Sequence, residues 1–278
     1  MKKFTAMTAA LALMLALCAC SSGAKNDLFA AAAPETSVLE LYICEDGESS
    51  RRLSMYDTDT ERALLDKLSG VKARPAEDWT PGDVTLPVYG INTGRNDNEP
   101  GLLEYAWSNG YLIASDGGAY KFDFDFAALE TDFEWRDKEE QPGIYVPCKH
   151  ALSLCDGGWI GALLNPAGEL TSPEGISMEL DYLDCADPGN SLIAVTFTNS
   201  GDEEWWYGTY YHLEAELDGA WYVVPAGTEL AFNDIAMLLP AGESRQEIYH
   251  TGAYGELPPG TYRFVAEGMA AQFVLDPS

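Results

Sequence analysis

Residues 192–199 read Leu-Ile-Ala-Val-Thr-Phe-Thr-Asn, and this stretch decides the fold of the C-terminal part of the chain. Ile193, Val195 and Phe197 lie on one side of an extended chain, because successive side chains of a strand point to opposite faces. The two threonines lie on the other side. The stretch therefore predicts a strand that buries one face of a sheet.

The same alternation recurs over residues 176–182 and 211–217, and turn sequences follow such stretches. Asp218-Gly219 and Pro258-Pro259-Gly260 are typical of turns between strands. Short strands with frequent turns and no convincing helix predict an all-β sandwich over residues 173–278.

Five segments of this region carry a resemblance to a known family. They include Leu-Pro-Ala-Gly-Glu-Ser at 239–244 and Leu-Pro-Pro-Gly-Thr-Tyr-Arg-Phe at 257–264; the others are 192–199, 207–214 and 219–225. In order and spacing they resemble the bacterial immunoglobulin-like domain of surface lipoproteins, chiefly of Firmicutes. The resemblance implies an immunoglobulin-like sandwich and a cell-surface setting, and it supplies no catalytic residues. Residues 37–140 lie outside it.

Residues 37–140 predict an α+β domain. Val38–Cys44 alternates and indicates a strand. Thr58 and Glu61 have the spacing of a capping box, which predicts one short helix from Asp59 to Ser69. Later strand signals, with the turn Asn109-Gly110, complete a small antiparallel sheet. Val84–Tyr89 also reads as a strand, and its proline predicts a place at the edge of that sheet.

Asp123 and Asp125 share the polar face of the aromatic stretch at 120–126. Two neighbouring carboxylates can bind Ca²⁺ or act as acid and base. Lys121 stands beside them, and simple strand alternation explains the pattern, so we interpret them as a solvent-exposed face. Residues 141–172, which hold three prolines and Gly157-Gly158, are expected to form a connector packed on both domains.

The N-terminus predicts a lipoprotein signal peptide over residues 1–19. Lys2 and Lys3 precede a short apolar run that ends in Leu-Cys-Ala-Cys at 17–20, which resembles a bacterial lipobox. Cleavage before Cys20 leaves its thiol for lipid attachment; Cys18 is a poorer candidate because a bulky Leu precedes it. An ordinary secretory signal that happens to contain two cysteines is the alternative.

Residues 20–36 are small and polar or Ala-rich and predict a flexible tether. The expected location is the extracellular face of the cell membrane, with the lipid anchor as the contact to the membrane. The chain holds 45 Asp and Glu against 16 Lys and Arg, a net charge of −29, and removal of residues 1–19 takes two lysines away. Such an acidic body is expected to stand away from an anionic lipid surface, and it excludes nucleic acid as a partner.

The remaining cysteines are Cys44, Cys148, Cys155 and Cys185. In an exported chain they allow three pairings, although free buried thiols are the simpler interpretation. His150 lies between two of them, but no fourth ligand is near, so no metal site and no cofactor is predicted.

Trp205 and Trp206 are the candidate ligand contacts. They follow Asp-Glu-Glu at 202–204, and aromatic rings beside carboxylates are typical of sugar or peptide binding. The alternative is that the nearby rings fill the sandwich core; Tyr207, Tyr211 and Trp221 belong to the segments that resemble the family. Adjacent strand residues point to opposite faces, so one of the two tryptophans is expected to be exposed.

No catalytic motif is present, and three scattered histidines do not form one. The sequence therefore predicts a non-enzymatic surface lipoprotein whose immunoglobulin-like domain serves as an interaction or spacer module, with an extracellular protein or glycan as partner. A solute-binding lipoprotein that captures carbohydrate, peptide or Ca²⁺ on an acidic aromatic face is the alternative. An enzyme with its site within residues 37–172 is a third.

Overall fold

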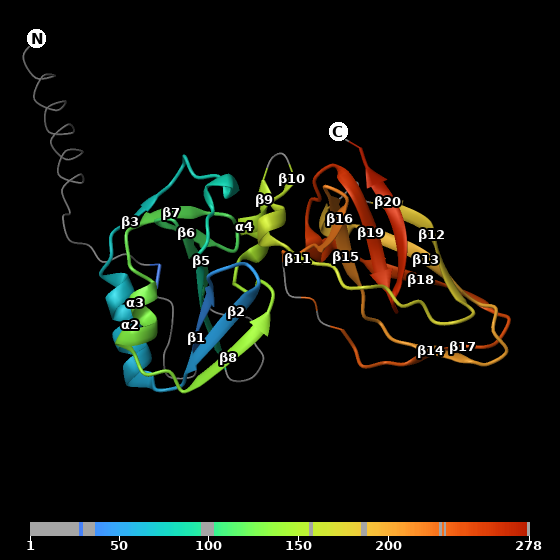
Figure 1. The fold of residues 1–278 in the computed structure, drawn as a ribbon, viewed down its shortest axis with the longest axis horizontal. Helices are drawn as coiled ribbons and strands as arrows, with labels where there is room; N and C mark the ends of the chain where they lie inside the picture. Colours follow the sequence, from blue (N-terminus) through green and yellow to red (C-terminus); the bar gives the residue numbers. More distant parts are fainter. Residues whose placement is uncertain are drawn as a thin grey trace, which may run out of the picture.

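The structure is a computed structural model that describes residues 28–29, 37–95, 103–155, 158–184, 188–227, 230 and 232–276. The described residues form two strand-built parts joined by a connector (Figure 1). In this part of the chain, no helix is long and apolar enough to cross a membrane. The predicted signal peptide and Cys20 lie outside the described residues.

One antiparallel sheet of eight strands, in the order β3-β7-β6-β5-β4-β1-β2-β8, forms the N-terminal part. The strands are β1 (Ser37–Cys44), β2 (Ser49–Met55), β3 (Ala73–Pro75), β4 (Val88–Arg95), β5 (Leu103–Ser108), β6 (Tyr111–Ala114), β7 (Ala119–Phe122) and β8 (Asp137–Pro142). The sheet is larger than the small one predicted. Its edge strand β8 reads Asp-Lys-Glu-Glu-Gln-Pro, which has no apolar alternation and therefore gave no strand signal.

Helices α2 (Thr58–Ser69) and α3 (Ala127–Asp132) lie on one face of this sheet, so the prediction of a single helix was wrong (Figure 1). The helix α2 is capped by Asp57, whose carboxylate accepts from Thr60 N at 2.9 Å, and not by Thr58. The predicted capping partner Glu61 is only 1% exposed and accepts from Leu39 N on β1 at 3.1 Å. Its carboxylate thus links the helix to the sheet.

The strand β4 lies in the interior of the sheet, between β1 and β5. The prediction of an edge strand there was wrong, because Pro87 precedes β4 and takes no part in its ladder.

Both faces of the sheet are covered. One face packs under α2 and α3, and Phe29 joins this core beside Tyr105 and Phe122. The predicted tether, residues 20–36, includes Phe29, but Phe29 is only 2% exposed, because burial of an aromatic side chain against a hydrophobic face is favourable. The other face, at Val88 on β4 and Ala106 on β5, packs against the connector.

The C-terminal part consists of two packed antiparallel sheets and a small two-stranded one. They are ordered β11-β16-β15-β19-β20, β12-β13-β18 and β14-β17. The strands are β11 (Asn165–Pro166), β12 (Ile176–Asp184), β13 (Leu192–Asn199), β14 (Trp205–Tyr207), β15 (His212–Leu217), β16 (Ala220–Val223), β17 (Met237–Leu239), β18 (Ser244–His250), β19 (Gly260–Ala266) and β20 (Met269–Leu275).

The two sheets share one core, in which β13 holds the place predicted for it. Ile193, Val195 and Phe197 are buried against Leu213 of β15 and Phe264 of β19. This confirms an antiparallel β-sandwich for the C-terminal part.

The connector contributes side chains to the cores of both parts. It contains the helix α4 (Lys149–Ser153), the hairpin of β9 (Leu154–Cys155) and β10 (Gly158–Trp159), a 3-10 turn at Gly161–Leu163 and β11. Leu152 and Leu163 pack on the N-terminal sheet, whereas Trp159 and Leu164 pack in the sandwich. Further 3-10 turns lie at Pro81–Asp83, Pro188–Asn190 and Gly252–Tyr254.

Candidate functional site

The two predicted ligand contacts, Trp205 and Trp206, face opposite sides of β14. Trp205 stacks on Tyr207 with ring centroids 4.7 Å apart and packs beside Phe197, so it belongs to the core. Trp206 is 55% exposed and donates through Nε1 to Glu204 at 3.2 Å. A single exposed ring on a strand forms no site by itself.

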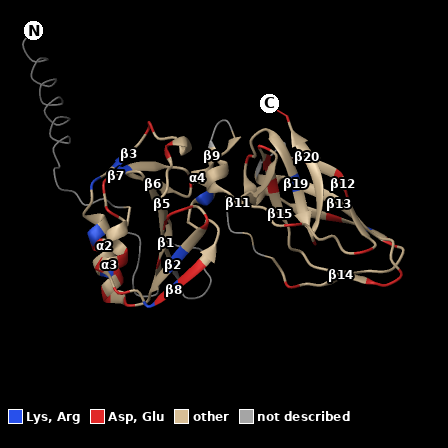
Figure 2. Ribbon diagram, viewed as in Figure 1, with Lys and Arg blue, Asp and Glu red and all other residues tan. Residues whose placement is uncertain are grey.

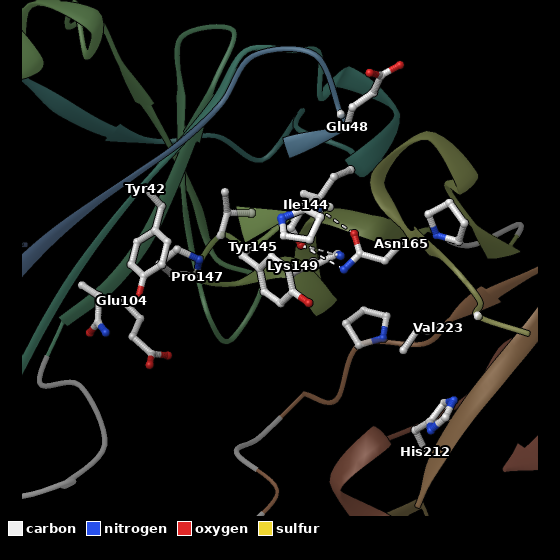
Figure 3. A pocket seen from close by; sticks show the side chains of 18 of the residues that line it. Tyr42, Glu48, Glu104, Ile144, Tyr145, Pro147, Lys149, Asn165, His212 and Val223 are labelled. Carbon is white, nitrogen blue, oxygen red and sulfur yellow. Dashed lines mark hydrogen bonds between the residues drawn. The ribbon is translucent and has the colours of Figure 1, made fainter. Parts of the chain in front are cut away.

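A cleft of about 1010 Å³ lies where the N-terminal part, the connector and the sandwich meet. Figure 3 shows Tyr42 and Glu104 of the N-terminal sheet on one side, His212 of the sandwich on the other, and Tyr145 and Lys149 of the connector between them. Ligand sites in proteins are concave and commonly lie between domains, with volumes of about 300–1,000 Å³. The cleft is therefore the candidate functional site of the described structure.

Asn165 fixes the wall of this cleft to the sandwich. Its Oδ1 accepts from Ile144 N at 2.6 Å, and its Nδ2 donates to Ile144 O at 3.4 Å (Figure 3). Because Asn165 pairs with Val223 across β11 and β16, one side chain joins the connector backbone to the five-stranded sheet.

Ser50 fixes the same wall to the N-terminal sheet. Its Oγ donates to Gly143 O at 2.9 Å and accepts from Tyr145 N at 2.8 Å. Gly143 has a φ of +91°, which disfavours every residue with a side chain. The backbone below Tyr145 is thus held from both domains.

Lys149 of the connector lies at the centre of the cleft. It is the only Lys or Arg among the described residues that line the cleft. Its Nζ donates to Ile144 O at 2.7 Å and stands 6.0 Å from the ring centroid of Tyr145. Burial lowers the pKa of Lys149 to about 8, because desolvation disfavours the ammonium form. The described residues give this ammonium no carboxylate partner within ion-pair distance.

His212 faces the cleft from β15 as part of a buried charge network. The alternation over residues 211–217 predicts that His212 and Glu214 share the solvent-exposed face of the strand, but Glu214 is buried and pairs with both His212 (2.8 Å) and Arg263. Burial alone would raise the pKa of Glu214; the hydrogen bonds from His212 and Arg263 outweigh it and lower the pKa. The guanidinium of Arg263 also lies 4.4 Å from the ring centroid of Trp221, so this face is covered rather than wet.

Two buried polar atoms on the cleft lining have no hydrogen-bond partner among the described residues. They are Oδ1 of Asn92 on β4 and Nδ1 of His212 on β15. Buried polar atoms are normally paired with protein or water, so each of these two lacks the partner that such an atom usually has. One comes from each domain.

The cysteines Cys44 and Cys148 are free thiols, as the simpler interpretation expects. Burial raises the pKa of Cys148 to about 12, which makes it unreactive at neutral pH. His150 binds Tyr254 O through Nε2 at 3.0 Å, and burial lowers its pKa. Cys185 and the side chain of Cys155 lie outside the described residues. Among the described residues no group of three or more His, Cys, Asp and Glu side chains could hold a metal ion.

Asp123 and Asp125 do not approach the cleft. Asp125 accepts from Ala127 N at 3.1 Å just before α3, a local structural contact. The charges of the molecule are unevenly spread, with most Lys and Arg on the N-terminal part and the sandwich strongly acidic (Figure 2).

Sequence reasoning missed the cleft residues because no motif joins them. Tyr42, Tyr145, Lys149, Tyr210 and His212 come from strands, a connector and a loop that are distant in sequence. The one signal that the sequence offers is the proline content of residues 141–172, which the expected packing of a connector on both domains explains without a binding site.

Residues 172–273 match the family model described as a bacterial Ig-like domain. No curated protein and no solved structure matches the chain in the corresponding comparisons. The match covers the strands β12 to β19 and most of β20, whose two main sheets pack around one core. The C-terminal part of the chain is therefore an immunoglobulin-like β-sandwich.

Proposed function

We propose that this chain is a non-enzymatic surface lipoprotein, held on the extracellular face of the cell membrane by lipid on Cys20. Its immunoglobulin-like domain serves as the interaction or spacer module. The observation that supports this most is the immunoglobulin-like sandwich at residues 172–273, a type of domain that suits surface and interaction roles.

The anchor rests on the sequence around Cys20. A lipoprotein cysteine carries at least two acyl chains, and two chains hold a protein stably on a membrane where one does not. Leu28 and Phe29 already pack on the N-terminal sheet, so seven residues, 21–27, separate Cys20 from the folded body. Fully extended, the eight residue-to-residue steps from Cys20 to Leu28 span at most about 28 Å. This is the largest distance by which the acidic body can stand away from the anchor point.

The acidic surface supports a partner other than nucleic acid. Residues 173–278 contain 18 Asp and Glu, two Arg and no Lys. Such a surface repels phosphate backbones and favours neutral or basic partners, an extracellular protein or a glycan.

A second candidate function is solute binding, and the cleft between the two domains favours it. Its volume, its aromatic lining and its two unpaired polar atoms are features of a ligand site rather than of a spacer.

The anchor is tested with a matched pair of variants, Cys20→Ala and Cys18→Ala, expressed with a clickable palmitate analogue. We expect the unchanged chain and Cys18→Ala to incorporate the label, to fractionate with membranes and to be digested by protease added to intact cells. Cys20→Ala should lose the label. Globomycin, which blocks lipoprotein signal cleavage, should leave the unchanged precursor unprocessed. Equal labelling of both variants, or a mature chain free of lipid, would overturn the anchor.

A further inference from the structure

We propose that the cleft between the two domains binds a short, neutral, hydroxyl-rich ligand, an oligosaccharide of a few sugar units. This deepens the second candidate function, solute binding at the cleft, on which it rests, because it assigns a ligand class to a site that the sandwich forms together with the N-terminal part and the connector. The inference rests on the rigidity, the rings, the unpaired polar atoms and the charge of the cleft.

Hydrogen bonds to both domains fix the wall of the cleft that carries Tyr145. Asn165 ties Ile144 to the sandwich, and Ser50 ties Gly143 and Tyr145 to the N-terminal sheet. A binding site whose walls are already fixed loses little conformational entropy on binding. The wall that carries Tyr145 is therefore suited to receive a ligand rather than to collapse.

Exposed tyrosine rings line the cleft on two of its sides. Tyr145 of the connector is 47% exposed and Tyr210 of the sandwich is 58% exposed, so both rings are accessible from the cleft. An aromatic face packs against the apolar C–H face of a sugar ring, while the tyrosine hydroxyl stays available for a hydrogen bond. Rings on two walls suit a ligand of more than one sugar unit.

The unpaired polar atoms set the chemistry at the walls. Oδ1 of Asn92 is an acceptor. Nε2 of His212 donates to Glu214, so Nδ1 is an acceptor in the neutral imidazole. Lys149 supplies donors between them. A ligand that fits this set must both donate and accept hydrogen bonds, as hydroxyl groups do.

The charge of the site excludes strongly charged ligands. A chain of net charge −29 repels polyanions. The lining of the cleft itself carries charges of both signs, the ammonium of Lys149 and the carboxylates of Glu48 and Glu104, so it matches neither a strongly cationic nor a strongly anionic ligand. The cleft therefore suits a neutral ligand. The rings of Tyr145 and Tyr210 and the acceptor atoms of Asn92 and His212 favour a sugar over an apolar molecule.

The test measures binding of chitotriose, cellotriose and maltotriose to the full chain in detergent, by isothermal titration calorimetry and saturation-transfer NMR. A blocked alanine tripeptide and trigalacturonic acid are the peptide and anionic comparisons. The variants are Tyr145→Ala and Tyr210→Ala, with Tyr145→Phe as the conservative change. Trp206→Ala, which removes an exposed ring away from the cleft, is the control.

We expect saturable binding of at least one neutral trisaccharide, weakened about tenfold or more by each tyrosine-to-alanine change, as for a contact at the centre of an interface. Tyr145→Phe and Trp206→Ala should stay within about twofold, below the roughly tenfold change that 1.4 kcal/mol gives. Absence of saturable binding of all three sugars overturns the proposal, as does binding that ignores both tyrosine changes. Tighter, Tyr145-dependent binding of the tripeptide or of the anionic sugar assigns the cleft to that class and equally overturns it. None of these results depends on Cys20. The binding experiment can therefore refute the proposed cleft site without refuting the proposed lipid anchor, and the labelling experiment can refute the anchor without refuting the site.

Discussion

The side chain of Asn165 forms hydrogen bonds with both the amide and the carbonyl of Ile144, at 2.6 and 3.4 Å. Asn165 belongs to the edge strand of the sandwich sheet, and Ile144 follows the edge strand of the N-terminal sheet. The side-chain amide of Asn165 therefore makes the pair of hydrogen bonds to Ile144 that the backbone of a neighbouring strand would make, and it makes them across the domain boundary. The relative placement of the two domains, and with it the width of the cleft, depends on this contact.

Replacement of Asn165 by alanine should lower the free energy of unfolding by about 1–3 kcal/mol, because two backbone groups lose their partner. The measurement is urea unfolding followed by circular dichroism. Asn233→Ala, at an exposed side chain, is the matched control and should change little. Equal effects of the two variants would contradict a structural role of the Asn165 amide.

Gly143→Ala should be more destabilising than Gly117→Ala. Both glycines have a positive φ, +91° and +83°, so each alanine incurs a similar backbone penalty of about 1–2 kcal/mol. A Cβ at Gly143 would also lie 2.8 Å from Oδ1 of Asn165, whereas one at Gly117 meets nothing within 4 Å. The difference between the two melting temperatures isolates the clash. It should vanish in an Asn165→Ala background.

The sandwich could be predicted from the sequence because its signals are local. The alternation at 192–199 reports directly on the faces of one strand, and it recovered the bounds of β13 and the burial of Ile193, Val195 and Phe197. The helix α2 was also predicted from a local pattern, the spacing of Thr58 and Glu61, although Asp57 is the residue that caps it.

The burial of Glu214, the role of Glu61 and the cleft could not be predicted, because they depend on tertiary contacts that no local sequence pattern encodes. Glu214 alternates with buried residues and reads as exposed, but Arg263 on a neighbouring strand keeps its carboxylate charged inside the protein. Glu61 has the spacing of a cap, yet the sheet offers it the amide of Leu39. The cleft is the extreme case, because its lining is brought together only when the two domains meet.

Phe29→Ala should lower the free energy of unfolding by about 3 kcal/mol, the lower end of the range for loss of a buried phenylalanine. The ring packs 5.3 Å from that of Tyr105 and 5.9 Å from that of Phe122, measured between centroids. Thermal unfolding of this variant beside Trp206→Ala checks the value. A change of the same small size in both would show that the segment before β1 adds nothing to the core.

Glu214→Gln should be strongly destabilising, by about 3–5 kcal/mol, because it leaves Arg263 buried without a counter-charge. The exposed pair of Asp59 and Arg62 provides the control, and Asp59→Asn should change the stability by less than about 1 kcal/mol. Chemical unfolding of both variants at pH 7 makes the comparison. A Glu214→Gln chain as stable as the unchanged one would contradict the buried network.

Lys149 should make the protein more stable as the pH rises from about 8 toward 10. Burial lowers its pKa to about 8 in the folded chain, while the unfolded chain keeps the ordinary value near 10.4. Between these two values the unfolded state binds more protons than the folded state, and stability then increases with pH. Below pH 8 the side chain of Lys149 is charged in both the folded and the unfolded chain. The folded chain is then destabilised by the full free-energy cost of burying this ammonium.

The measurement is urea unfolding at pH 7, 8, 9 and 10 for the unchanged chain, Lys149→Met and Lys138→Met. The gain should amount to at most about 3 kcal/mol, disappear in Lys149→Met, and persist in Lys138→Met, because Lys138 lies on the exposed strand β8. Above pH 10 the buried tyrosines act in the opposite direction. Burial raises the pKa of Tyr42 and of Tyr262 to about 12, so the unfolded chain loses their protons first and stability falls. A pH profile that is flat up to 10 in the unchanged chain would show that the ammonium of Lys149 stays hydrated in the cleft.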